Sequence, residues 1–340
     1  TRMFLNLVVL IGGDWKQLTP VIPGGTDRHQ LEASVKNSSL FVNFTTVRLR
    51  ANHRLLPGQH HYRAFLKRVG TGTINDSQGR VKLPSLMVQP SRDELINEIF
   101  PADLPNPTNN WKQLAERAIL CPLNRDTLTL NEIIMERLNT AEERLNTAER
   151  VYHAVTLPLV DETGENELDA DADHENLSRM TPPGIPEHIL RVRVGAVMMI
   201  IRNISLEEGL CNGTRVQVTE LFDNIIRCRI LTGTHVGNEH DLPLLVVTKA
   251  PHEGPFKCER IQFPLRPGSV MTINKSQGQT LARVGVQTLA RVGVLLDSAQ
   301  CFSHGQLYVA LSRVRDANSI RVCTTRNDRR VKNVVMRELL

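Results

Sequence analysis

The sequence has 340 residues, with 41 Lys and Arg against 36 Asp and Glu and a net charge of +5. Apolar residues make up 41% and charged residues 23% of the chain, which excludes an intrinsically disordered protein, and the length allows two or three domains. The six cysteines are scattered without a C-x-x-C pair, which disfavours a zinc knuckle or a disulfide framework and indicates a reducing compartment. The apolar runs are far shorter than the roughly 20 residues of a membrane span, so we expect no membrane partner.

The first predicted element is a buried strand of a parallel sheet, in the apolar run 5–11. It ends in Gly12-Gly13-Asp14, and α/β sheets bind ligands at such strand ends. Because a central strand needs neighbours, we expect this chain to lack upstream residues that complete the domain. The segment that follows, up to about residue 61, shows few regular patterns, and we expect a domain boundary near its end.

The middle of the chain predicts two helices. Ser91 is a candidate N-cap of a short one. Apolar residues at intervals of three and four predict a long helix over 127–153, which Asp126 can cap. Within it ERLNTAE at 136–142 is repeated at 143–149, and the second copy would lengthen the helix by about 10 Å.

The pattern changes after the acidic stretch 161–175, which predicts a solvated linker. Between 191 and about 264, short β-rich runs separated by turns such as Asn212-Gly213 predict a small barrel or sandwich inserted in the larger domain. Alternating helix and strand patterns return over 271–322, where QTLARVGV at 279–286 is repeated at 287–294.

Candidate chemistry begins with the segment GDWKQLTPV at 13–21. At the end of a strand, the carboxylate of Asp14 can hold a magnesium-bound water and the amide of Gln17 can sense a terminal phosphate. An ordinary turn after a strand is the alternative interpretation.

Two arginines are candidates for contact with a nucleotide: Arg54 in the segment LRANHRL and Arg313 at the end of FSHGQLYVALSRV. A guanidinium matches the geometry of phosphate oxygens. Taken in isolation, each is better explained as a solvated surface arginine.

A third type of site is predicted in the segment TINKSQGQTL, at a helix start. Exposed backbone N–H groups and the side chains of Thr272, Lys275, Ser276 and Gln277 suit the phosphate backbone of a nucleic acid. A capped helix without a ligand is the alternative.

These four segments, in this order, resemble the petite-integration-frequency helicase family, a branch of helicase superfamily one that includes RecD-like proteins and the helicases of Helitron transposons. The resemblance extends to 121–124, 198–218 and 263–265 and covers nearly the whole chain. It implies an α/β fold of RecA-like helicase domains, the first partial and the second complete, with a small β-rich SH3-like insert. The implied domains are the first-domain remnant 1–57, the second domain in two parts, 58–190 and 266–340, and the insert 191–265.

The resemblance also implies roles. Gln17 would couple the γ-phosphate of ATP to DNA contacts, with Asp14 close to the nucleotide and Mg²⁺. Arg54 and Arg313 would be the two arginine fingers of the second RecA-like domain. Thr272, Lys275, Ser276 and Gln277 would bind single-stranded DNA, and the insert would guide DNA near the duplex junction. The complete enzyme would hydrolyse ATP and move 5′ to 3′, in repair, recombination, telomere maintenance or transposition, with the nucleus or the mitochondrion as its location.

The sequence departs from the family in two motifs. No G-x-x-x-x-G-K-[ST] occurs in it, and no apolar strand ends in a suitably placed Asp-Glu pair, so the residues that bind the β- and γ-phosphates and Mg²⁺ are absent. We therefore expect the chain to need a missing N-terminal helicase half and to be inactive alone. A non-catalytic, transposon-derived module that binds nucleic acid remains the alternative. A relaxase fusion would need a metal-binding histidine cluster, and an oxidoreductase would need G-x-G-x-x-G; neither is present.

Overall fold

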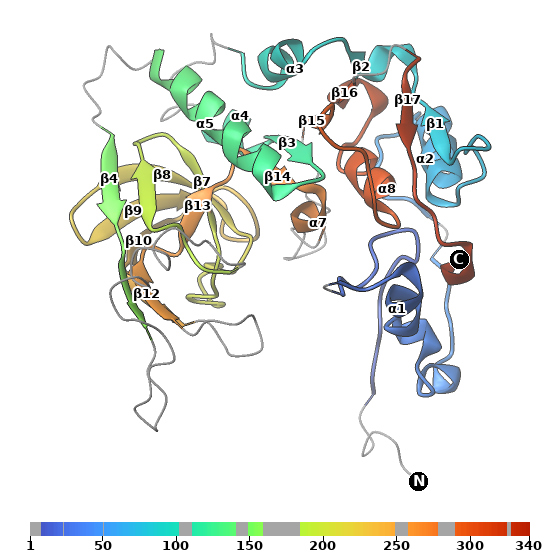
Figure 1. Cartoon of the computed structure of the whole chain (residues 1–340), viewed down its shortest axis with the longest axis horizontal. Coiled ribbons are helices and arrows are strands. Elements are labelled where there is room, and N and C mark those ends of the chain that lie inside the picture. Colours follow the sequence, from blue (N-terminus) through green and yellow to red (C-terminus); the bar gives the residue numbers. More distant parts are fainter. Residues whose placement is uncertain are drawn as a thin grey trace.

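The computed structural model describes residues 8–22, 24–49, 51–101, 111–140, 149–158, 184–248, 258–277, 290–324 and 328–340. Figure 1 shows a β-rich part on the left, a central and right-hand α/β part, and an N-terminal segment at the lower right. No helix of the described ranges is long and apolar enough to cross a membrane.

The α/β part is built on a five-stranded parallel sheet in the order β14-β3-β15-β16-β2. Its strands are β14 (Val270–Thr272), β3 (Arg117–Cys121), β15 (Arg291–Leu296), β16 (Ile320–Thr324) and β2 (Val88–Gln89). Strands that are distant in sequence thus lie side by side, because the whole β-rich part falls between β3 and β14 in the chain. The predicted return of α/β structure after an insert is confirmed.

Helices cover both faces of this sheet. Strand β3 shows how: Ala118 and Leu120 pack on one face against α2 (His60–Gly70) and α8 (Gln306–Leu311), whereas Ile119 and Cys121 pack on the other. The second face is covered by the helices α3 (Arg92–Ile99), α4 (Trp111–Ala115) and α5 (Asn124–Thr140). A parallel strand buried on both faces needs a continuous apolar run, which β3 and β15 provide.

The β-rich part contains three small antiparallel sheets. The largest is ordered β10-β9-β8-β7-β13, with β10 (Glu239–Pro243), β9 (Ile225–Ile230), β8 (Arg215–Leu221), β7 (Val197–Ile200) and β13 (Leu265–Pro267). The others are β11 (Leu245–Thr248) with β12 (Cys258–Gln262) and β5 (Val155–Pro158), and β4 (Arg150–His153) with β6 (Ile189–Val192). A core of its own, which includes Phe263, confirms the predicted β-rich insert.

Short elements complete the described ranges. The strands β1 (Arg80–Lys82) and β17 (Arg330–Lys332) pair with each other. The short helix α1 (Asp27–Glu32) lies in the N-terminal segment, and the short helix α7 (Ile273–Ser276) follows β14. The 3₁₀ turns are η1 (Val35–Asn37), η2 (Phe41–Asn43), η3 (Ser85–Met87), η5 (Ala317–Ser319) and η6 (Arg337–Leu339). The predicted cap is confirmed: the Ser91 hydroxyl accepts a hydrogen bond of 3.2 Å from the Glu94 N–H.

The long helix predicted over 127–153 is wrong at its C-terminal end. Helix α5 begins at Asn124, which places Asp126 in its first turn rather than at its cap, and residues 150–153 form β4, paired with β6. Pairing with a strand some 40 residues away has overridden the local helical pattern. The β-rich part therefore starts before the predicted residue 191. The second ERLNTAE copy and the acidic linker lie almost wholly outside the described residues.

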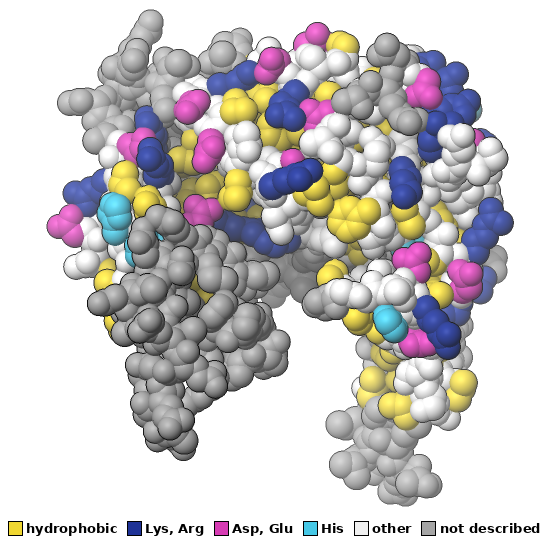
Figure 2. Space-filling view, viewed as in Figure 1, with side chains coloured by type: hydrophobic (Ala, Val, Ile, Leu, Met, Phe, Trp, Pro, Cys, Tyr) yellow, Lys and Arg dark blue, Asp and Glu magenta, His cyan; other side chains and the backbone are white. Residues whose placement is uncertain are grey.

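The predicted buried strand at 5–11 is also wrong for the part that is described. Residues 8–11 form no strand, and Val8 and Leu10 are 98% and 94% exposed. Hydrophobic side chains likewise lie at the surface over the N-terminal segment, at the lower right of Figure 2. A parallel strand takes its burial and its hydrogen bonds from neighbouring strands, and none of the described residues pairs with this run.

Candidate nucleotide-contacting and nucleic-acid-binding site

The candidate site is assembled around α8. The residue before this helix, Gly305, has a φ of +75°, which an L side chain rarely adopts. A Cβ at this position would also lie 2.5 Å from the carbonyl oxygen of Lys16. A glycine is therefore required for the loop of residues 14–18 to pack directly on the start of α8.

The Asp14 carboxylate forms its hydrogen bonds within the contact between this loop and α8. One carboxylate oxygen accepts a hydrogen bond of 2.8 Å from Lys16 Nζ, and the other accepts one of 2.9 Å from the Tyr308 hydroxyl. Burial would raise the pKa of Asp14, but the hydrogen bonds and charge of Lys16, together with the Tyr308 bond, lower it below its usual value. Asp14 is thus an ionised group that joins the loop to α8.

His304 makes a second connection between the loop and α8. Its Nδ1 accepts a hydrogen bond of 2.9 Å from the Met336 N–H, so its Nε2 carries the proton and donates to the Trp15 carbonyl at 2.8 Å. The ring is fully buried. One imidazole therefore links the N-terminal loop, the start of α8 and the C-terminal end of the chain.

The two candidate finger arginines meet at Ser312, although 258 residues separate Arg54 from this serine. Arg54 Nη1 lies 3.3 Å from the carbonyl oxygen and 3.4 Å from the hydroxyl of Ser312, and Arg313 Nη2 donates to the same hydroxyl at 3.2 Å. The structure thus brings together the two guanidinium groups that the sequence singled out.

Electrostatic strain accompanies this arrangement. Burial and the neighbouring charge of Arg54 lower the pKa of the Arg313 guanidinium to about 10, so Arg313 stays charged at neutral pH. The bonds of Arg313 go to the Val309 carbonyl, the Ser276 carbonyl and the Ser312 hydroxyl. Two like charges held close together by neutral acceptors favour the arrival of an anion.

The residues predicted to bind nucleic acid gather at α7. Thr272 is the N-cap, and its hydroxyl accepts a hydrogen bond of 3.4 Å from the Lys275 N–H, which confirms the predicted helix start. Lys275 is exposed, whereas Thr272 and Ser276 are buried and the Ser276 hydroxyl donates to the Ile273 carbonyl at 2.7 Å. Gln277 follows as the C-cap.

Gln306 and Asn274 connect α8 with α7; they lie in the segments FSHGQLYVALSRV and TINKSQGQTL but are not among the predicted site residues. Gln306 is fully buried; its amide nitrogen donates to Asn274 Oδ1 at 2.9 Å, and its amide oxygen accepts from the N–H groups of Phe302 and Ser303. Together with the bond from Arg313 to the Ser276 carbonyl, this contact joins the helix of the finger arginine to the candidate DNA-contacting helix. The signal in the sequence that could have indicated Gln306 is a polar amide at the start of an otherwise apolar helix.

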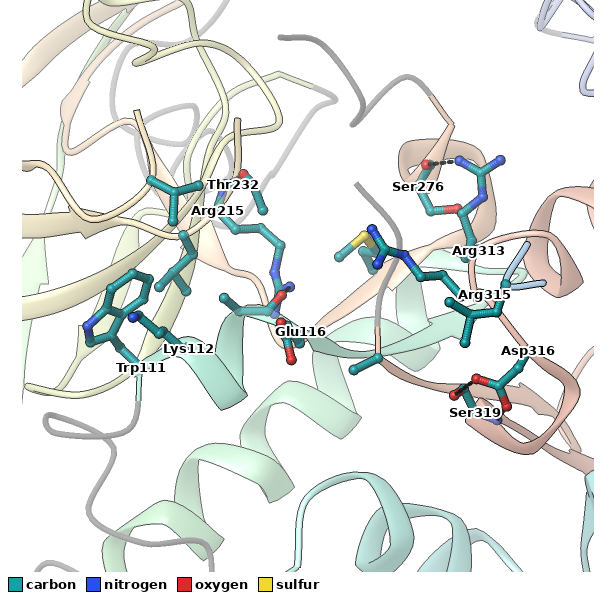
Figure 3. A pocket seen from close by; sticks show the side chains of 16 residues that line it. Trp111, Lys112, Glu116, Arg215, Thr232, Ser276, Arg313, Arg315, Asp316 and Ser319 are labelled. Carbon is teal, nitrogen blue, oxygen red and sulfur yellow. Dashed lines mark hydrogen bonds between the residues drawn. The ribbon is translucent and has the colours of Figure 1, made fainter. Parts of the chain in front are cut away.

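A cleft of about 550 Å³ lies beside these helices. Figure 3 shows Ser276, Arg313, Arg315, Asp316 and Ser319 on one side and Trp111, Lys112, Arg215 and Thr232 on the other. The cleft thus separates α7 and α8 from the junction between the α/β and β-rich parts. On the face in Figure 2, Lys and Arg side chains are interspersed with Asp and Glu and do not gather into one patch.

Of the predicted site residues, the structure therefore groups Arg54 with Arg313, and Thr272, Lys275, Ser276 and Gln277 with one another. Asp14 and Gln17 lie in the loop on α8, where the Gln17 N–H bonds the Asp14 carbonyl at 2.9 Å. Both Asp14 oxygens accept hydrogen bonds, from Lys16 and from Tyr308, and the place of this carboxylate near the nucleotide and Mg²⁺ stays a prediction. No group of three or more metal-ligating side chains occurs among the described residues.

Comparison with protein families gives two matches: residues 1–80 match the model of PIF1-like helicases, and residues 175–221 match the 2B domain of DNA helicase Pif1. The ATP-dependent DNA helicase PIF1 of Danio rerio is 35% identical over 137 residues, which are 39% of this chain and 19% of that protein. Human PIF1 is 32% identical over 155 residues, 45% of this chain and 22% of that protein. The alignments thus span about a fifth of the length of these relatives.

Solved structures show the same fold. The crystal structure of the Pif1 helicase from Candida albicans superposes with a TM-score of 0.58 at 21% identity, over 96% of this chain and 66% of that one. Bacteroides Pif1 bound to single-stranded DNA superposes with a TM-score of 0.54 at 21% identity, over 96% and 62%. Residues 1–80 and 175–221 are thus similar in sequence to PIF1-like helicases and to the Pif1 2B domain, and the chain shares the fold of solved Pif1 helicases.

Proposed function

We propose that this chain is the C-terminal portion of a Helitron-type, ATP-dependent 5′-to-3′ DNA helicase of superfamily one. The observation that supports this most directly is the meeting of Arg54 and Arg313 at Ser312. Two guanidinium groups on one hydroxyl provide several N–H donors for the oxygens of a triphosphate. In phosphoryl transfer, arginines so placed stabilise the charge that develops on the transferred group.

ATP would be bound jointly with a phosphate-binding loop outside these 340 residues. Arg54 and Arg313 fit its phosphates because their other partners are uncharged oxygens of Ser312, Ser276 and Val309. A similar solved structure, Bacteroides Pif1 at 21% identity and a TM-score of 0.53, is described as a complex with ADP-AlF3 and single-stranded DNA. Mg²⁺ would be held together with the ATP phosphates by the missing half, where the magnesium-binding motif of the family is expected.

Single-stranded DNA would contact α7. The exposed ammonium of Lys275 suits a backbone phosphate, and the bonds from Gln306 to Asn274 and from Arg313 to Ser276 offer a direct route by which nucleotide and DNA affect each other. Gln17, in the loop packed on α8, would couple the γ-phosphate of ATP to these DNA contacts.

The alternative is a non-catalytic module that binds single-stranded DNA without ATP turnover. The sequence favours it for the chain by itself, because no G-x-x-x-x-G-K-[ST] is present. In both proposals the chain binds DNA, and they differ in whether an added phosphate-binding half restores turnover.

The test is a titration of fluorescent single-stranded DNA at several salt concentrations, with an ATPase assay in parallel. We expect binding that weakens with salt and no ATP turnover by the chain alone. Lys275→Ala should weaken binding for all sequences and reduce the salt slope by about 1. Lys82→Ala, which removes an exposed lysine on β1, is the control and should leave both unchanged. Binding that ignores salt would contradict the DNA proposal, and turnover by the chain alone would contradict its incompleteness.

A further inference from the structure

The contact between the β-rich and α/β parts depends on a buried arginine. Arg215, at the start of β8, has no exposed surface, and its guanidinium reaches out of its own sheet. Its Nη2 donates to the Arg117 carbonyl at 2.9 Å and its Nη1 to the Ala115 carbonyl at 3.0 Å, both in the α4–β3 segment of the α/β part. Its Nε donates to the Gly268 carbonyl at 3.0 Å, in the segment that leads back into the parallel sheet.

Each of these acceptors is a backbone carbonyl, so the contact fixes the main chain of α4 and β3 and not merely a side chain. Burial lowers the pKa of the Arg215 guanidinium to about 10, which leaves it charged at neutral pH. A buried charge is tolerated only while its donors are matched by acceptors. A change in the orientation of the β-rich part would separate them, and would be opposed for that reason.

Trp111 makes the reciprocal contact. It begins α4 in the α/β part, and its indole packs against the β9–β10 hairpin: the Arg229 guanidinium carbon lies 5.7 Å from the ring centroid, and a Cβ on Gly237 would lie 3.6 Å from the ring. Leu231, fully buried at the end of β9, packs into the same core as Leu114 of α4. One side chain from each part is thus inserted into the other.

This junction also forms one side of the cleft. Trp111, Lys112 and Arg215 line it opposite Arg313 and Ser276 (Figure 3). We infer that Arg215 and Trp111 are positioning residues that hold the β-rich part in one orientation and thereby set the width of the cleft beside α7 and α8. The consequence for DNA binding rests on the proposed function, whereas the junction itself does not.

The test uses tryptophan fluorescence, because the sequence has only two tryptophans and Trp15→Phe leaves Trp111 as the single reporter. In this background Arg215→Met keeps most of the side-chain volume but removes the donors. We expect Trp111 emission to shift to longer wavelength and quenching by acrylamide to increase. The matched control is Arg260→Met. Arg260 is equally buried, but it bonds Thr156 and the Pro186 carbonyl within the β-rich part, so it should leave the Trp111 signal unchanged.

A second pair of variants applies if Arg215→Met does not fold. Arg229→Ala removes the cation over Trp111 and the ion pair with Glu239. Arg227 lies on the same strand as Arg229, and Arg227→Ala removes its ion pairs with Asp241 and Glu220. Only Arg229→Ala should increase quenching of Trp111. Equal quenching in Arg215→Met and Arg260→Met, or in Arg229→Ala and Arg227→Ala, would overturn the inference.

DNA binding by the same proteins separates this inference from the proposed function. If both hold, Arg215→Met should weaken single-stranded DNA binding roughly tenfold, the scale of a coupling between two sites, and Arg260→Met should not. Absence of DNA binding by the unaltered chain would contradict the proposed function and leave the fluorescence comparison valid. Opening of the junction without any change in DNA affinity would overturn the inferred effect on the cleft.

Discussion

Two apolar runs of similar composition end in opposite environments. Residues 291–296 form β15 with five consecutive buried positions, whereas residues 8–11 form no strand and leave Val8 98% exposed. β15 has β3 on one side and β16 on the other and helices on both faces, and the described N-terminal run has no such neighbours. The difference teaches that burial of a parallel strand is supplied by its neighbours and not by its own hydropathy.

The loop of residues 14–18 has an intermediate position. It belongs to the N-terminal segment, yet it is held on α8 through Asp14, the Trp15 carbonyl and the close approach at Gly305. The N-terminal segment is thus joined to the α/β core through this loop, while most of its apolar side chains stay exposed. Substitutions in the core, the loop and the exposed run should therefore have graded effects.

The largest difference is expected between Leu120→Ala and Leu10→Ala. Leu120 is fully buried in β3, and its truncation should lower the free energy of unfolding by about 2–5 kcal/mol. Leu10 is 94% exposed, and the same substitution should change it by less than about 0.5 kcal/mol. Denaturant unfolding of the two variants measures both values. Equal losses would mean that residues 8–11 are buried in solution.

Gly305→Ala should have the next largest effect. The positive φ and the clash with the Lys16 carbonyl together should cost about 2–4 kcal/mol, or release the loop from α8. Gly24→Ala is the control, since its φ of +68° is similar but a Cβ there meets nothing within 4 Å, so only about 1–2 kcal/mol is expected. Hydrogen exchange of residues 14–18 distinguishes release of the loop from global destabilisation. A Gly305→Ala loss no larger than that of Gly24→Ala would show that the loop does not pack closely.

Asp14→Asn should produce the smallest effect, below about 1 kcal/mol, and one that depends on pH. The pKa of Asp14 is lowered by folding, so its contribution to stability is present above the unfolded value of 3.8 and is lost as the pH falls through the lower folded value. The stability difference between the unaltered chain and Asp14→Asn should therefore be constant at neutral pH and shrink below about pH 3.8.

The quantity to measure is the difference in the free energy of unfolding between the unaltered chain and Asp14→Asn, and not the stability of either protein alone. Hydrogen bonds from the N–H of Arg80, and further bonds from Gln78 and Arg330, lower the pKa of Asp76 to about 2. Asp76 therefore also makes stability depend on acid pH, equally in both proteins, and its contribution cancels in the difference. Tyr308→Phe removes one of the three hydrogen bonds to Asp14, the others coming from the N–H and Nζ of Lys16, and should reproduce part of the effect. A difference that grows as the pH falls would contradict the ionised state of Asp14.

Local signals predicted several features of the fold correctly. The cap Ser91, the helix start in the segment TINKSQGQTL, the short β-rich runs after residue 191 and the turn at Gly213 follow from residue types and spacing that act over a few positions. The meeting of Arg54 and Arg313 was predicted through the family resemblance, not through spacing. The roles of the site residues and the division into domains remain predictions.

Other features depend on contacts between distant segments, which no local pattern encodes. Residues 150–153 form β4 because β6 is available as a partner. Residues 8–11 are exposed, and none of the described strands pairs with them. Likewise Gln306 finds Asn274 across 32 residues, and Arg215 finds the α4–β3 carbonyls across about 100. Their importance appears only once the chain has brought these segments together.

The imidazole of His304 has a mechanical consequence. It bonds Trp15 near one end of the described chain and Met336 near the other, so these two hydrogen bonds would carry part of a stretching force applied across those ends, together with the bond from Tyr308 to Asp14. Such a load would detach the N-terminal loop before any parallel strand slides. In an optical-tweezers experiment the earliest, low-force extension should therefore come from this detachment, and His304→Ala should lower the force at which it occurs.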